Sequence, residues 1–166
     1  ETIKDGPNTL DELEINRVKA FFSEPNYKSR GADELSKYTD NKQFSQWLLR
    51  CTHKHKKLGY RSVTLSLKSN EQAPGDATSD QMRSVAELAE QYSFSEIRVS
   101  HEQNLILADV LEDDLFELWE KAKVQKLTTP NIGLLTDIIC CPGGDFCSLA
   151  NAKSIPIAKS IQDIFD

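Results

Sequence analysis

The chain has 166 residues, of which 39% are hydrophobic and 28% charged, and its formal net charge is −6. This length and composition indicate a soluble globular protein with one medium domain, or one small domain with appendages, and exclude a disordered chain. The acidic balance argues against nucleic acid as a partner. No apolar run approaches the roughly 20 residues that span a bilayer, and no signal-peptide pattern opens the chain. We therefore expect a cytoplasmic protein with no membrane partner.

Three of the four cysteines fall within eight positions of one another, at Cys140, Cys141 and Cys147. Four cysteines are too few for a disulfide scaffold in a chain of this size, and in a reducing compartment clustered cysteines more often bind metal or take part in redox chemistry. The sequence begins at Glu1 without a methionine and stops at Asp166 inside a helical pattern. We expect an excised piece of a longer protein.

The first part of the chain is predicted to be helical. Apolar residues recur at helical spacing over residues 10–22, after a capping pattern at Thr9, and Pro25 ends this amphipathic helix. The mixed composition of residues 24–38 predicts an irregular connection.

A second helix is predicted to follow, capped by Asp40 and continuing through a basic cluster to Gly59. In that helix Cys51 is interpreted as a buried, small apolar residue. His53 and His55 are placed at an exposed helix end, where basic groups complement the helix dipole.

From Tyr60 onward the periodicity alternates between strands and helices. This order is most of a split β-α-β unit of the ferredoxin-like type, and the right-handed crossover rule places both helices on one face of the sheet. The elements expected are a strand at 60–68, a helix at 79–91, a strand at 97–99, a turn at 101–104, a central strand at 105–110 and a helix at 112–125.

The last part of the chain carries the clustered cysteines. A fourth strand is predicted over residues 134–141, followed by a helical segment from Phe146 to Phe165 with Pro156 as a break or restart. Neighbouring side chains on a strand point to opposite faces, so Cys140 is predicted to be buried beside Cys141.

Cys141 and Cys147 flank five residues that include Pro142 and a Gly-Gly pair. Iron-sulfur clusters are usually held by four thiolates, so this loop supplies half of a site. The turn would allow backbone N–H groups to face bridging sulfides, and a helix start near Phe146 would add a positive dipole end. Zinc could use the same two thiolates.

The run DIICCPGGDFCSL, residues 137–149, closely resembles the first cysteine pair of siroheme-containing nitrite and sulfite reductases. The upstream runs LGYRSVTLSLKS, QMRSVAELAEQY and IRVSHEQNLIL resemble the second ferredoxin-like half-domain of that family. The resemblance covers about residues 44–155. It divides the chain into an N-terminal helical linker at 1–43, a half-domain at 44–128 and the truncated start of the siroheme and 4Fe-4S domain at 129–166, in an α+β fold.

The resemblance implies that Cys141 and Cys147 are two ligands of a 4Fe-4S cluster, with the other two ligands outside the chain. It also implies that Arg98, Gln103 and Asn104 occupy the surface that contacts siroheme in the other half-domain. The parent would reduce sulfite to sulfide or nitrite to ammonia, with ferredoxin or a flavoprotein as electron donor. The isolated piece, lacking the rest of the reductase, should be inactive.

Two other readings of the cysteines remain open from the sequence. The chain is then either a non-catalytic ferredoxin-like binding or regulatory module, with zinc or nothing at its cysteines, or a thiol-redox protein. The five-residue gap between Cys141 and Cys147 is unlike the Cys-x-x-Cys redox motif, which disfavours the thiol-redox reading.

Overall fold

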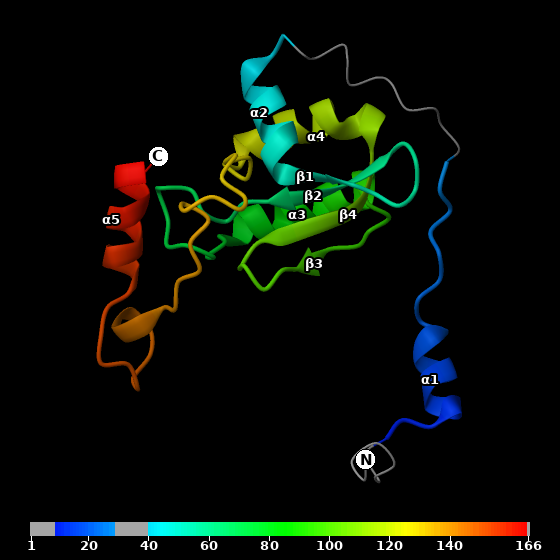
Figure 1. The fold of residues 1–166 in the computed structure, drawn as a ribbon, viewed down its shortest axis with the longest axis horizontal. Helices are drawn as coiled ribbons and strands as arrows, with labels where there is room; N and C mark the ends of the chain where they lie inside the picture. Colours follow the sequence, from blue (N-terminus) through cyan, green and yellow to red (C-terminus); the bar gives the residue numbers. More distant parts are fainter. Residues whose placement is uncertain (1–8, 29–39, 166) are drawn as a thin grey trace.

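The computed structural model describes residues 9–28 and 40–165. Three helices pack beside a small antiparallel sheet, while a helix near each end of the described chain lies away from it (Figure 1). The elements are α1 (Glu12–Lys19), α2 (Lys42–Cys51), β1 (Thr52–Lys54), β2 (Tyr60–Leu65), α3 (Ser79–Tyr92), β3 (Arg98–Val99), β4 (Leu105–Leu111), α4 (Leu115–Val124) and α5 (Ile155–Phe165), with short 3₁₀ turns η2 (Glu112–Asp114) and η3 (Gly143–Asp145).

The sheet has the strand order β1-β2-β4-β3, with every neighbouring pair antiparallel. The predicted internal position of the strand at 105–110 is confirmed, because β4 pairs with β2 on one side and with β3 on the other. Val63 lies opposite Leu107 and Leu65 opposite Leu105, so these side chains share one face of the sheet.

That shared face is covered by helices α2, α3 and α4. Their buried side chains form a single apolar cluster with the strands, in which Trp47, Leu65 and Leu107 have no exposed surface. Helices α3 and α4 also contact each other, as the crossover rule predicts. The opposite face is more polar: His53, Ser62 and other side chains there line a cavity of about 240 Å³ beside the segment after Pro130.

Helix α3 is the best-defined of the predicted helices. Thr78 accepts a hydrogen bond from the backbone N–H of Gln81, and the Gln81 side chain accepts one from the backbone N–H of Thr78. This reciprocal capping box fixes the start of the helix at Ser79, where the sequence predicted it.

The prediction that the second helix continues to Gly59 is wrong. The helix is capped by Asn41 rather than Asp40 and ends at Cys51, because Thr52 is extended and pairs with Val63 as the first residue of β1. Tertiary pairing with β2 therefore outweighs the helical propensity of the basic cluster. His53 is exposed as predicted, although it lies on a strand.

Two predictions for the cysteine region are also wrong. Residues 134–141 form no strand, because the backbone of Cys140 bonds to a side chain, Gln103, instead of to a neighbouring strand. Residues 146–154 are turns, and α5 begins only at Ile155, with Pro156 in its first turn, where the missing N–H is tolerated.

Helix α1 covers the middle of the predicted range 10–22. It is capped by Asp11, which accepts a hydrogen bond from the Glu14 N–H at 2.7 Å, and not by Thr9. Most apolar residues of the predicted range remain exposed, including Leu13 at 81% within the helix and Phe22 at 78% after it. Most of the connection predicted over residues 24–38 lies outside the described residues. Among the residues that are described, no helix is both long and apolar enough to cross a membrane.

Candidate functional site

The cysteine loop is a tight turn that exposes two thiols. Cys141 and Cys147 are free and exposed on either side of η3. The N–H of Cys147 donates to the carbonyl of Gly143 at 2.8 Å, which closes the turn. Gly143 has a φ of 59°, and a Cβ there would lie 2.8 Å from the Ala152 carbonyl oxygen, so no other residue fits without a shift.

The far side of the loop is tied to the segment that leads into α5. The N–H of Gly144 donates to the Ala152 carbonyl at 2.7 Å, and Asp145 pairs with Lys153 at 3.0 Å. Asp145 therefore ties the loop to the segment before α5. The predicted helix dipole at Phe146 is absent, because α5 starts nine residues later.

The other two cysteines are buried and belong to the interior. Burial raises the pKa of the Cys51 thiol to about 12 and also raises the pKa of the Cys140 thiol. The prediction of a buried Cys140 is confirmed, although the residue does not lie on a strand. A raised pKa disfavours the thiolate, which is the form that acts as a nucleophile and as a metal ligand.

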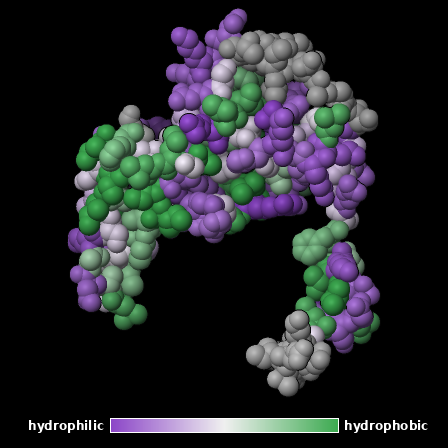
Figure 2. Space-filling view, viewed as in Figure 1, coloured by the Kyte–Doolittle hydropathy of each residue, from purple (hydrophilic) through white to green (hydrophobic). Residues whose placement is uncertain are grey.

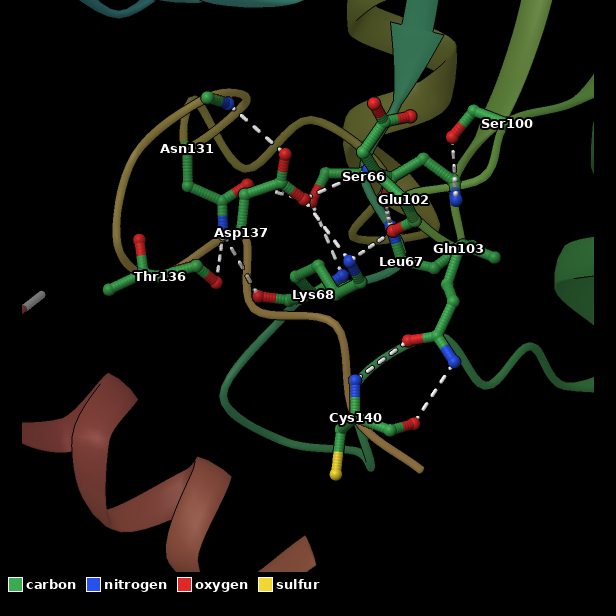
Figure 3. A network of polar contacts seen from close by, with 12 residues as sticks. Ser66, Leu67, Lys68, Ser100, Glu102, Gln103, Asn131, Thr136, Asp137 and Cys140 are labelled. Atoms are coloured by element: carbon green, nitrogen blue, oxygen red, sulfur yellow. Dashed lines mark hydrogen bonds and ion pairs between the residues drawn. The ribbon is translucent and has the colours of Figure 1, made fainter. Parts of the chain in front are cut away.

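Gln103 and Asn104, two of the three residues predicted to face siroheme, contact the segment that leads to the cysteine loop. Gln103 donates from Nε2 to the Cys140 carbonyl at 3.0 Å and accepts the Cys140 N–H on Oε1 at 2.9 Å (Figure 3). Asn104 accepts the Leu67 N–H at 3.0 Å and donates to Asp137 at 2.9 Å. Arg98, the third, is 59% exposed and pairs with Glu96 at the sheet edge.

A buried ion pair lies beneath the same segment and was not predicted. The side chain of Lys68 has no exposed surface, and its Nζ lies 3.1 Å from Oδ1 of Asp137, whose side chain is 5% exposed. Lys68 also donates to the Glu102 carbonyl, so the ammonium has two oxygen partners (Figure 3). The only sequence signal was a lysine that directly follows an alternating apolar run.

Two buried amides complete this polar network. Asn131 donates to the carbonyls of Lys68 and Thr136 at 3.3 and 3.2 Å, and Gln162 of α5 donates to the same two carbonyls at the same distances. Gln162 has no exposed surface. The network therefore joins α5 and the segment after Pro130 to the end of β2.

A second polar cluster lies at the other end of the sheet. The Tyr27 hydroxyl donates to Asp109 at 2.6 Å, and His55 Nε2 lies 3.3 Å from the same carboxylate oxygen. His55 is only 15% exposed, so its prediction as a residue of an exposed helix end is wrong. Tyr27 also packs edge-on against Tyr60 and Phe94, in the wall of a cavity of about 900 Å³.

The described residues contain no group of three or more His, Cys, Asp or Glu side chains placed to hold a metal ion. Cys141 and Cys147 can therefore supply two thiolates, and further ligands would have to come from elsewhere. Their exposure suits such a shared site, because a group bound to both sulfurs would remain open to ligands from another segment. The donor set fits half of a four-thiolate cluster site.

The antiparallel sheet, with its helices on one face and a free cysteine pair after it, defines an α+β ferredoxin-like unit. Residues 53–124 match the model of the Nitrite/Sulfite reductase ferredoxin-like half domain. These residues are therefore similar to a half-domain of the nitrite and sulfite reductases, and the predicted fold class and family resemblance are confirmed.

Three chloroplastic ferredoxin–nitrite reductases are similar to the chain. The protein of Zea mays is 29% identical over 87 residues, that of Spinacia oleracea 25% over 93, and that of Oryza sativa subsp. japonica 30% over 69. These matches cover 49%, 53% and 42% of the chain, but only 15%, 16% and 12% of the relatives.

Proposed function

We propose that the chain is part of a reductase that reduces nitrite to ammonia or sulfite to sulfide at a siroheme coupled to a 4Fe-4S cluster. In this proposal residues 1–43 are a linker, residues 44–128 a ferredoxin-like half-domain, and residues 129–166 the start of the domain that binds both cofactors. The observation that carries it is the exposed pair Cys141 and Cys147, on a glycine turn directly after a half-domain of this family.

Cys141 and Cys147 are proposed as two of the four cluster ligands. Both thiols are exposed and open to a bound cluster, whereas Cys140 and Cys51 are buried and burial raises the pKa of each of these two thiols. When bound, the cluster and siroheme supply the electron transfer and the reduction of the anion, and the protein orients and tunes them.

The substrate is a small anion, and the relatives favour nitrite over sulfite because all three are named as nitrite reductases. Their names likewise favour ferredoxin over a flavoprotein as the electron donor. Because the chain supplies two thiolates among its described residues and covers at most 16% of these relatives, we propose that it is inactive without the rest of the reductase, in the cytoplasmic setting expected from its sequence.

Anaerobic reconstitution of the full-length parent, followed by optical and paramagnetic-resonance spectroscopy, tests the proposal. The parent should show siroheme and cluster signals and turn over nitrite with reduced ferredoxin. Cys141→Ala and Cys147→Ala should each lose the cluster signal, whereas Cys140→Ala, the matched control, should keep it. A parent without either signal, or stoichiometric zinc bound by the 166-residue chain, would reject the proposal in favour of a non-catalytic module.

A further inference from the structure

Gln103 holds the peptide group immediately before Cys141 at both of its polar ends. Its side-chain amide accepts the Cys140 N–H at 2.9 Å and donates to the Cys140 carbonyl at 3.0 Å. The amide therefore takes the place of a neighbouring strand and fixes the orientation of the backbone from which the Cys141 side chain departs (Figure 3).

The backbone at Gln103 is strained in a way that points to its side chain. Its φ is 59°, in the left-handed region where glycine or asparagine is favoured and most other residues are disfavoured. A glutamine at such a position carries a conformational cost that glycine would not. Strain of this kind persists where the surrounding structure requires it, and among the residues that the structure describes this side chain makes its polar contacts to Cys140.

The surroundings of Gln103 are built to leave room for this contact. Gly75 has a φ of 87°, and a Cβ added there would lie 2.9 Å from Cβ and 3.1 Å from Oε1 of Gln103. Gly75 is itself held by its N–H, which donates to the Leu67 carbonyl at 2.9 Å. Any larger residue at position 75 would push the Gln103 amide away from Cys140.

The next residue anchors the same segment at a second point. Asn104, which is 1% exposed, donates to Asp137, three positions before Cys140. The Asn104 side chain also accepts a hydrogen bond from the N–H of Leu67, which lies two residues after the end of β2. Consecutive side chains of one turn thus hold the segment 137–140 at both ends, and this turn belongs to the half-domain rather than to the cysteine loop.

We propose that Gln103 is a positioning residue, which acts through the Cys140 peptide to set where the Cys141 sulfur is presented, with Gly75 as the residue that leaves room for it. This inference rests on the proposed function, because it assigns the half-domain a task in building the cluster site. Gln103 touches neither the cluster nor the substrate in this role, unlike the siroheme contact expected from the sequence.

The test uses the 166-residue chain without metal and two local reporters, hydrogen exchange at the Cys140 amide and alkylation of the buried Cys140 thiol. Gln103→Gly removes both hydrogen bonds to the Cys140 backbone and also relieves the backbone strain. The free energy of global unfolding should therefore remain unchanged, while the exchange rate and the alkylation rate at Cys140 should each rise on the order of tenfold, as for the loss of two ordinary hydrogen bonds. Gly75→Ala should give the same local effect. Gln91→Ala, on the exposed side of α3, is the matched control and should leave both rates unchanged.

A conservative variant adds a signature that general loosening would not give. Gln103→Glu keeps an acceptor for the Cys140 N–H, and it regains a donor for the Cys140 carbonyl only when its carboxyl is protonated. Exchange at Cys140, corrected for the intrinsic pH dependence, should approach that of the parent chain below the usual glutamate pKa of about 4.3 and exceed it at neutral pH.

Unchanged Cys140 exchange and alkylation in Gln103→Gly would overturn the proposal, as would loss of the whole fold in that variant. The proposed function fails separately, because it is tested by cofactor signals in the parent protein and not by these rates. If the parent protein held neither siroheme nor a cluster, the two hydrogen bonds from Gln103 to Cys140 would still hold the segment in place, but they would have no role in cluster binding.

Discussion

Replacing Lys68 by methionine should strongly destabilise the chain, because it removes one member of a buried ion pair. The Lys68 side chain is fully buried and the Asp137 side chain is 5% exposed. Breaking a buried pair costs about 3–5 kcal/mol, since the remaining charge stays in a poorly solvated place. Asp137 would keep the donors Asn104 and Gly133, which favours the lower end, about 3 kcal/mol.

For a chain of this size, a loss of about 3 kcal/mol corresponds to a melting temperature lower by roughly 6–12 °C. Urea unfolding followed by tryptophan fluorescence measures the free energy directly, because Trp47 and Trp119 both lie in the core. Arg83→Met is the control: Arg83 is 73% exposed, and its pair with Asp80 should contribute little.

The double variant Lys68→Met with Asp137→Asn separates the charge effect from the loss of packing. It should be more stable than Lys68→Met alone, because no unpaired charge then remains buried. A free energy of unfolding for Lys68→Met within about 1 kcal/mol of that of the parent chain would show that the ion pair contributes little to stability. A double variant less stable than Lys68→Met would show that an unpaired buried charge is not the cause of the loss.

Three further outcomes are expected. Burial, and then the hydrogen bond and charge of Asp109, raise the pKa of Tyr27 to about 12, against about 10 in an unfolded chain. This stabilisation is full below pH 10 and is lost as the pH rises through 12, so an ultraviolet titration of Tyr27→Phe should lack a late-titrating tyrosine that the parent chain shows. Alkylation at neutral pH, read by peptide mass spectrometry, should modify Cys141 and Cys147 quickly and Cys51 and Cys140 slowly, and equal rates at all four would contradict the burial of the latter pair. Thr78→Ala should lower the free energy of unfolding by about 1 kcal/mol in urea, whereas no change would mean that the capping box of α3 is dispensable.

The half-domain could be predicted from sequence because its elements carry strong local signals. The helix from Ser79 shows both periodicity and a capping box, and the apolar run of β4 indicates an internal strand. The boundary at Cys51 could not be predicted, because β1 is three residues long and exists only through its pairing with β2. Pairing of this kind is a tertiary effect that local propensity does not contain.

The exposed cysteine pair could be found from the sequence, whereas the contacts that support it could not. The spacing of Cys141 and Cys147 was visible directly, and so was the turn between them. The partners of Cys140 were not, since Gln103 lies 37 positions away and bonds to backbone atoms, which leave no trace in residue types. An apolar run such as LLTDIICC predicts a strand. Here the Gln103 side chain makes the backbone hydrogen bonds to Cys140 that a neighbouring strand would otherwise make.

The part of the chain after residue 128 also differs from the half-domain in its surface. Apolar side chains gather over α5 and the segments before it (Figure 2). The most exposed are Leu149 at 88%, Phe146 at 76% and Ile164 at 73%. The hydrogen bonds of Gln162 to the Lys68 and Thr136 carbonyls link this surface to the segment that follows β2.

The aromatic and helical contacts around the sheet show that the matched half-domain and the folding unit differ in extent. The family match begins at His53, yet Phe44 and Trp47 of α2 are 1% and 0% exposed in the core, and Tyr27 supplies a hydrogen bond to Asp109 from still earlier in the chain. A piece cut at residues 53–124 would lack α2 and expose the core side chains that α2 covers. It would also remove the Tyr27 hydroxyl, which donates a hydrogen bond to the buried Asp109 carboxylate. Engineered exchanges of this half-domain should therefore place their junction before Tyr27, outside the residues that the family model matches.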